Sequence, residues 1–354
     1  MISFEIYLIA EDGATTEVGS VLDFIGSSTV EPIRGSPSSF VYRNGDTRVQ
    51  FTVTLGEELL SGGQRGEPDL LNPPVPEHAD ALVESSLSRA RHDEEAFDGD
   101  DVPSFQTAPV TVSVPLFHPT FFLTEALAFL EPLAQVGKLK IACLSDGEED
   151  SGSDPQLMPV TNEALFNAWL DLHRSVYPQL IDAARTPIQF WTKEECAHFY
   201  DYNVAREELQ HAFNSEGVEV VPIQLARHEG RVKTLCVWRV DRPVVLPATD
   251  LILVERPRRR GLFGGRRVEE FIVTTPEVWT RLQPFTEQRY DPVPMLICCH
   301  PPESSSSLVT DIIEAGSESV DNAQPTGFGG ITDLDLATRE TTANSDADPE
   351  MLGE

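Results

Sequence analysis

The chain has 354 residues, of which 58 are Asp or Glu and 26 are Lys or Arg, so its net charge is −32. Forty per cent of the residues are apolar, enough for a sizeable core, which excludes a wholly disordered chain. So negative a field opposes binding to nucleic acid or an anionic membrane, and no apolar run reaches the roughly 18 residues of a spanning helix. With five cysteines, an odd number, and no leader-like N-terminus, we expect a cytoplasmic protein.

The excess negative charge is concentrated in two segments. Residues 56–108 contain 13 acidic and 3 basic side chains, and residues 302–354 contain 12 and 1. Both segments have little apolar periodicity and are rich in residues that disfavour a packed core. We therefore predict a long acidic disordered insertion and an acidic disordered C-terminal tail. Residues 222–301, in contrast, carry a net charge of +4.

Short alternating stretches in the first 160 residues predict half-buried strands. We expect these strands over residues 3–10, 40–43, 46–55, 110–116 and 138–144. Asn44-Gly45, between the second and the third, favours a type I′ hairpin turn. The stretch from Pro119 to Gly137 has helical spacing, and with its flanking strands it predicts one βαβ unit whose strands run parallel.

The next part of the chain predicts two helices followed by a sheet. The helices cover residues 161–177 and 192–213, and a Thr192/Glu195 capping box opens the second. We expect a four-stranded meander, a short helix from Thr275 and a last strand; the strands cover residues 218–227, 231–240, 244–255, 268–274 and 293–299. Trp169, Trp191 and Trp238 should lie in the core, because each falls on or beside an apolar stripe.

This order of elements predicts an α+β fold, with mostly antiparallel sheet, one βαβ unit and helices on one face. The expected units are residues 1–160, which contain the insertion, residues 161–301, and the tail 302–354. Whether the first two form one domain or two stays open.

The most distinctive motif is an arginine-rich loop between the third and fourth strands of the meander. Six arginines fall within twelve residues, with two apolar residues between glycines at the apex: Arg256, Arg258, Arg259, Arg260, Leu262, Phe263, Arg266 and Arg267. Guanidinium groups bind carboxylates and phosphates bidentately, and an apolar tip can act as an anchor. The loop therefore predicts a docking finger for an acidic protein or for the acidic arms of the chain itself. A solvated loop and a nucleic-acid site are the alternatives, the latter opposed by the negative charge elsewhere.

Three weaker candidates could carry chemistry. His118 precedes Pro119 at the turn into the βαβ helix, and Asp146 follows the second strand, so both fall at the sheet edge where ligands usually bind. Cys298 and His300 share a strand face, but no further ligands stand at metal spacing, so we expect no metal. On the helix over residues 192–213, two Glu–His pairs lie four residues apart and suit acid–base work, although acidic surface helices commonly look the same: Glu194 with His198, and Glu207 with His211.

Phosphate-loop, dinucleotide-binding, zinc-protease and nucleophile-elbow motifs are all absent from the sequence. We therefore predict a non-catalytic protein-interaction module of adaptor, inhibitor or immunity type, which uses the arginine loop and the acidic arms. It should bind a protein partner, acidic where it meets the loop, and no cofactor, nucleic acid or membrane. The alternative is a hydrolase or transferase with His118 and Asp146 as its catalytic pair.

Overall fold

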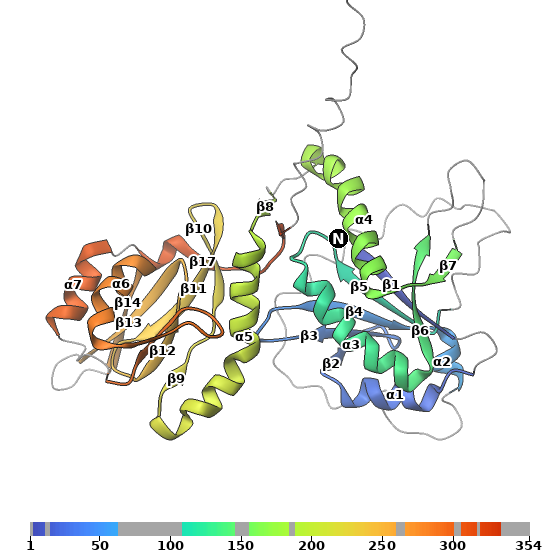
Figure 1. Cartoon of the computed structure of the whole chain (residues 1–354), viewed down its shortest axis with the longest axis horizontal. Helices are drawn as coiled ribbons and strands as arrows, with labels where there is room; N and C mark the ends of the chain where they lie inside the picture. Colours follow the sequence, from blue (N-terminus) through green and yellow to red (C-terminus); the bar gives the residue numbers. More distant parts are fainter. Residues whose placement is uncertain are drawn as a thin grey trace, which may run out of the picture.

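The computed structural model describes residues 3–10, 15–62, 108–145, 156–183, 188–259, 266–300, 306–316 and 319–333. Helix α5 (Lys193–Phe213) stands between two bodies of sheet and helix (Figure 1). The N-terminal body is built on a seven-stranded sheet, and the C-terminal body on a five-stranded and a four-stranded sheet. The predicted α+β fold class is confirmed. The division into domains near residue 160 stays a prediction.

The seven-stranded sheet has the order β2-β3-β4-β5-β1-β6-β7, and every neighbouring pair is antiparallel. Its strands are β1 (Ser3–Ala10), β2 (Val30–Pro32), β3 (Ser39–Arg43), β4 (Gln50–Leu55), β5 (Val110–Pro115), β6 (Leu139–Ser145) and β7 (Gln156–Pro159). Because β1 pairs antiparallel with both β5 and β6, those two strands run parallel to each other. With α3 (Phe121–Gly137) between them in the chain, the predicted βαβ unit is confirmed, with β1 inserted between its strands.

One face of this sheet is covered by helices. Phe4, Ile6 and Leu8 of β1 are buried in the same apolar cluster as residues of α3 and α1 (Val18–Ser27). The prediction missed α1, β2 and the short helix α2 (Glu57–Gly62). Neither α1 nor its flanks carry a clear start signal, since Glu17 at its N-cap makes no side-chain capping hydrogen bond.

The hairpin of β3 and β4 is confirmed, but the predicted two-residue turn is wrong. Residues 44–49 form a longer loop, in which the Asn44 side-chain oxygen accepts hydrogen bonds from the backbone N–H groups of Asp46 and Thr47. The left-handed residue is Arg48, with φ of 61°, rather than Asn44 or Gly45. The side chain of Asn44 therefore organises the turn by bonding its own backbone, a competing use of asparagine that the Asn-Gly pattern does not reveal.

Gly56, between β4 and α2, lies against the returning chain at β5. Its N–H donates to the carbonyl of Pro109 at 2.8 Å, and a Cβ built on it would lie 2.7 Å from the carbonyl oxygen of Ala108. Because this obstacle is backbone, Gly56→Ala should lower the free energy of unfolding by about 2 kcal/mol. Gly45→Ala is the matched control, since nothing lies within 4 Å of its added Cβ. Urea unfolding measures both, and equal stability of the two variants would contradict the packing argument.

In the C-terminal body, the five-stranded sheet has the order β14-β13-β11-β10-β17 and the four-stranded sheet the order β15-β16-β12-β9. The strands are β9 (Glu219–Val220), β10 (Gln224–His228), β11 (Arg231–Arg239), β12 (Val244–Pro247), β13 (Leu251–Arg259), β14 (Arg266–Thr274), β15 (Glu287–Arg289), β16 (Met295–Cys298) and β17 (Ala323–Pro325). The predicted meander is wrong, because β11 and β13 are parallel and β12 lies in the other sheet. The expected strand over residues 244–255 breaks at residues 248–250, where the chain changes sheets.

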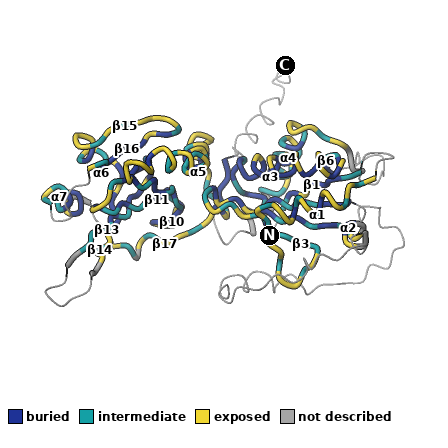
Figure 2. Tube along the Cα trace, turned by 90° about the horizontal axis from the view of Figure 1, so that it is seen from below, coloured by how far each residue is buried: buried dark blue, intermediate teal, exposed yellow. Residues whose placement is uncertain are grey.

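The two central strands of the four-stranded sheet, β12 and β16, are buried on both sides, which explains their unbroken apolar runs. Val245 and Ile297 belong to the cluster that contains the inner face of α5, whereas Val244 and Leu296 belong to the cluster of the five-stranded sheet. Figure 2 shows buried segments in both bodies. The expected core positions of Trp169, Trp191 and Trp238 are confirmed, with exposures of 0, 5 and 0 %.

The prediction of a disordered tail over residues 302–354 is wrong for the part that the structure describes. Helix α7 (Ser307–Gly316) packs beside α6 (Thr275–Leu282), with Val309 and Ile312 fully buried. The chain then adds β17 to the five-stranded sheet and pairs β18 (Ile331–Thr332) with β8 (Gln189–Phe190). The acidic composition obscured a helical apolar stripe: Leu308, Val309, Ile312 and Ile313. Residues 334–354, like residues 63–107 of the predicted insertion, lie outside the described residues.

The C-terminal return ends on the N-terminal body. Asp333, which is 4 % exposed, accepts hydrogen bonds from the N–H and the hydroxyl of Thr120, the N-cap residue of α3. A carboxylate at this position satisfies a free N–H and complements the helix dipole. Phe328, just upstream, is buried against Phe121, Phe199 and Trp191. The described end of the chain therefore connects the two bodies.

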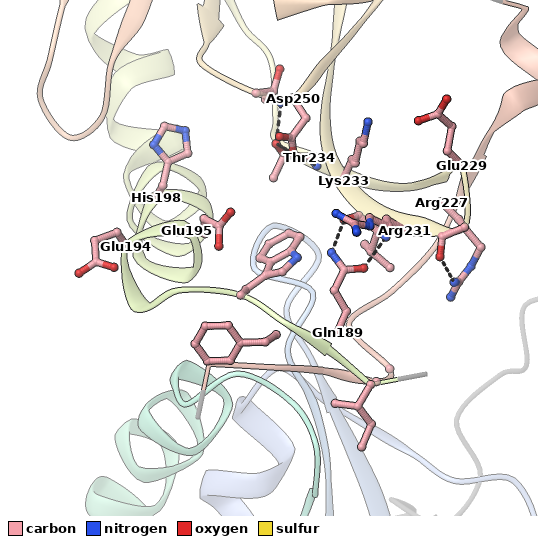
Figure 3. Close-up of a pocket in the computed structure, with 18 of the residues that line it drawn as sticks. Gln189, Glu194, Glu195, His198, Arg227, Glu229, Arg231, Lys233, Thr234 and Asp250 are labelled. Atoms are coloured by element: carbon pink, nitrogen blue, oxygen red, sulfur yellow. Dashed lines mark hydrogen bonds between the residues drawn. The ribbon is translucent and has the colours of Figure 1, made fainter. Parts of the chain in front are cut away.

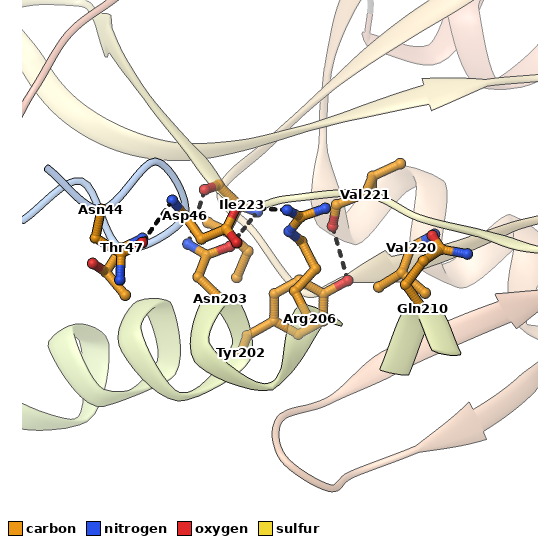
Figure 4. A network of polar contacts seen from close by, with 10 residues as sticks. All are labelled: Asn44, Asp46, Thr47, Tyr202, Asn203, Arg206, Gln210, Val220, Val221 and Ile223. Atoms are coloured by element: carbon orange, nitrogen blue, oxygen red, sulfur yellow. Dashed lines mark hydrogen bonds and ion pairs between the residues drawn. The ribbon is translucent and has the colours of Figure 1, made fainter. Parts of the chain in front are cut away.

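Helices α4 (Asn162–Ala183) and α5 are confirmed, including the capping box formed by Thr192 and Glu195. Buried polar side chains of α5 bind the backbone that leads into the C-terminal sheets (Figure 4). The Asn203 amide donates to the carbonyl of Ile223 and accepts from its N–H, and the Tyr202 hydroxyl donates to Val221. On the N-terminal side, Arg206 pairs with Asp46 at 2.5 Å. Helix α5 thus forms side-chain hydrogen bonds with the C-terminal body and an ion pair with the N-terminal body.

Candidate functional site

The arginine-rich segment forms the end of a long hairpin between β13 and β14. Strand β13 pairs with β11 only as far as Glu255, whereas its ladder with β14 continues to the pair Arg259–Arg266 (Figure 1). Residues 256–259 and 266–269 therefore form a two-stranded extension beyond the five-stranded sheet, which we call the arginine hairpin. The described residues of the expected loop over residues 255–267 are strand, because the ladder continues for four residue pairs beyond Glu255.

Two pairs of arginines stand directly opposite each other in the arginine hairpin. Arg258 faces Arg267 in the register, and Arg259 faces Arg266. The register therefore makes each of these arginines the direct cross-strand neighbour of another arginine. Like charges at such positions disfavour the ladder unless an anion lies between or near them. Val268, one position along, is an apolar residue that is 48 % exposed.

Arg256 is bonded within the chain. Its guanidinium pairs with Glu269 at 2.9 Å and lies 5.5 Å from the centroid of the Phe271 ring, and its side chain is only 14 % exposed. Arg256 therefore has a partner on the opposite strand of this chain, and its expected contact with another molecule stays a prediction. Arg260, Leu262 and Phe263 lie outside the described residues.

His118 lies at the corner between β5 and α3, as expected. Its Nδ1 is 3.1 Å from the carbonyl oxygen of Leu116, and its ring packs against Phe122. Burial lowers the pKa of the imidazole, while the bond to Leu116 acts in the opposite direction. Asp146 lies outside the described residues, so the proposed catalytic pair is not tested.

The cysteine and histidine at the end of β16 are bonded within the chain. The Cys298 thiol lies 3.7 Å from the carbonyl oxygen of His300, and the Cys299 thiol lies 3.8 Å from a carboxylate oxygen of Glu216. Burial raises the pKa of Cys298 to about 11, which keeps the thiol protonated. In the part of the chain that the structure describes, no three His, Cys, Asp or Glu side chains are grouped to hold a metal.

The first Glu–His pair of α5 lies in a cleft that sequence reasoning did not identify. Glu194 and His198 line a cavity of about 1000 Å³ together with residues of the β10–β11 hairpin (Figure 3). The Nε2 of His198 lies 2.6 Å from the carbonyl of Ala248, so Nε2 carries the proton in this contact. The second pair, Glu207 and His211, lies further along the helix and does not line the cleft.

Two side chains close the strand edge that borders the cleft. Residues 231–234 of β11 extend beyond the start of β13, which leaves one side of this segment without a strand neighbour. The Gln189 amide bonds both the N–H and the carbonyl of Val232, at 2.7 and 2.8 Å. The Asp250 carboxylate accepts from the N–H and the hydroxyl of Thr234, both at 2.8 Å. These side chains replace the missing strand, a common protection of exposed edges.

The cleft was missed because its walls come from segments far apart in the sequence. Residues near 190, 230, 250 and 330 meet there, and no local pattern links them. The one signal was the Glu194–His198 spacing, which acidic surface helices also show.

Comparison with known proteins gives no match to a family model, to a curated protein or to a solved structure. No helix among the described residues is both long and apolar enough to cross a membrane. Function is therefore inferred from the geometry of this chain alone.

Proposed function

We propose that this protein is a non-catalytic protein-interaction module of adaptor, inhibitor or immunity type, which docks an acidic partner on the arginine hairpin. The observation that supports this proposal most is the register of the hairpin, which sets Arg258 opposite Arg267 and Arg259 opposite Arg266. A partner carboxylate near each pair relieves the repulsion and gains bidentate hydrogen bonds. In the protein without a partner, the opposed arginines lower the stability of the hairpin. We therefore expect these arginines to contribute favourably only in the complex.

The surroundings of the hairpin favour a protein over a polyanion. The whole chain carries −32, so a nucleic acid approaching the hairpin is repelled by most of the molecule. A folded acidic partner presents its charge on one face and can meet the hairpin alone. The exposed Val268 adds an apolar contact within the charged surface, an arrangement that suits a protein interface.

The test compares capture of a partner by the full chain and by a hairpin variant in lysate of the host cell, with native mass spectrometry of the captured complex. The variant Arg258→Ser, Arg259→Ser, Arg266→Ser, Arg267→Ser should lose at least tenfold of a stoichiometric protein partner. The matched control Arg43→Ser, Arg242→Ser removes two exposed surface arginines and should retain it. Undiminished capture by the hairpin variant would contradict the proposal, as would a captured nucleic acid in place of a protein.

A further inference from the structure

The cleft beside α5 is separate from the arginine hairpin, and its chemistry does not depend on the function proposed for that hairpin. It opens between the first turns of α5 and the β10–β11 hairpin (Figure 3), and Trp191 is one of its lining residues. At about 1000 Å³, its volume is at the upper end of the range for ligand sites. Phe190, at one side, is 52 % exposed.

The two walls of the cleft carry opposite charge. Glu194 and Glu195 lie in the first turn of α5, where the Glu195 carboxylate accepts the N–H of Thr192. The β10–β11 wall carries three basic residues and one acidic residue: Arg227, Arg231, Lys233 and Glu229. Two residues apart on a strand, Arg231 and Lys233 lie on the same side of β11. Within the described ranges no ion pair joins the walls, and neither the Arg231 nor the Lys233 side chain has a hydrogen-bond or ion-pair partner. The walls are therefore complementary to a ligand that carries both signs of charge.

The strand edge inside the cleft restricts how such a ligand binds. The N–H and carbonyl of Val232 are already bonded to Gln189, and the N–H of Thr234 to Asp250. A peptide that added to β11 as a further strand would have to break these bonds and would gain little in exchange. Recognition must therefore come from side chains that reach the two charged walls, with apolar contact to Phe190.

From these observations we propose that the cleft binds an extended polypeptide segment of mixed charge. An acidic side chain of the segment pairs with Arg231 and Lys233, and a basic side chain pairs with Glu194. A polypeptide fits better than a small zwitterion, because the walls belong to separate elements and the volume holds several residues rather than one. Since the charged groups are partly exposed, the complex should weaken as salt is raised.

The experiment uses a phage-displayed library of random twelve-residue peptides, selected on the full chain. Selected peptides should carry an acidic and a basic residue at a recurring spacing, and one of them, labelled, gives the dissociation constant by fluorescence anisotropy. The variant Arg231→Glu, Lys233→Glu should weaken binding at least tenfold. The same peptide with its acidic residue changed to lysine should recover binding to this variant, which a general loss of structure would not allow.

The outcomes separate this site from the arginine hairpin. The four-serine variant of the hairpin should bind the selected peptide as the unchanged protein does, and the Glu194→Lys variant should favour peptides whose basic residue has become acidic. A library without enrichment would overturn the proposal. Equal binding of the selected peptide to the unchanged protein and to Arg231→Glu, Lys233→Glu would overturn it as well.

Discussion

Replacement of Glu125 by leucine is expected to lower the free energy of unfolding by about 4 kcal/mol, because a charged acceptor of three hydrogen bonds is lost. Glu125 lies on α3 and is 7 % exposed. Its carboxylate accepts from the hydroxyl of Tyr42 at 2.7 Å, and from the amide of Asn44 and the hydroxyl of Thr47 at 2.8 Å. Leucine keeps much of the volume, so the loss reports the three unpaired donors rather than a cavity.

The effect should extend beyond α3. The turn that Glu125 holds also carries Asp46, whose carboxylate pairs with Arg206 of α5. Burial and the hydrogen bond to Glu125 raise the pKa of Tyr42 above its ordinary value. In the variant, ultraviolet titration should show the pKa of Tyr42 moved down toward that value.

The control for this prediction is Glu131→Leu, which removes a carboxylate from the exposed side of the same helix. Its single hydrogen bond to Asn162 is exposed, so the free energy of unfolding should change by about 0.5 kcal/mol or less. Urea unfolding at pH 7 measures both variants. A loss below about 1 kcal/mol for Glu125→Leu would mean that the three donors find water or other acceptors, and the polar cluster would carry little stability.

Local signals predicted most of the elements, because alternation and capping act within a few residues. The strand with Phe4, Ile6 and Leu8 and the capping box of α5 are both as expected. What the sequence could not supply is the partner of each strand. Val244–Pro247 and Leu251–Arg259 form one continuous pattern, yet they enter different sheets, because Asp250 bonds Thr234 and turns the chain. That bond joins residues 16 apart and leaves no periodic trace.

The candidate site was predictable only in part, for the same reason. The arginines are conspicuous in the sequence, but the register that pairs Arg256 with Glu269 and leaves Arg258 opposite Arg267 follows from the ladder. Composition also misled: the acidic residues of the C-terminal segment concealed Ile312 and Phe328, which are buried. A helical stripe of four apolar residues within an acidic segment is therefore better evidence of order than net charge is of disorder.

Acid is expected to destabilise this fold through His173, by roughly 3 kcal/mol between pH 7 and pH 4. His173 is fully buried on α4; its Nε2 accepts the N–H of Phe117 at 3.0 Å, and its Nδ1 donates to the carbonyl of Trp169 at 2.9 Å. The pKa of the imidazole is lowered from 6.5 to about 4, chiefly by burial; the bond to Trp169 raises it and the nearby His118 lowers it to a smaller extent.

The direction follows from proton binding. Between pH 6.5 and about pH 4 the unfolded chain holds a proton on His173 that the folded protein does not, so stability falls as the pH is lowered through this window. Below it both states are protonated and the dependence on this residue ends. His173→Gln removes the titration, so the difference in unfolding free energy between the unchanged protein and this variant should shrink across the same window.

Urea unfolding at four pH values between 7 and 4 measures that difference, with His211→Gln as the control for loss of an exposed imidazole on α5. Parallel pH profiles of the unchanged protein and His173→Gln would contradict the assignment.

Hydrogen exchange is a second measurement, which identifies where in the fold the pH effect acts. Because a protonated Nε2 cannot accept a hydrogen bond, the Phe117 N–H should exchange faster as the pH falls, after correction for intrinsic rates, while buried amides of the five-stranded sheet keep their protection. Loosening should therefore begin at the corner between β5 and α3, where Phe117 holds a left-handed conformation with φ of 58°.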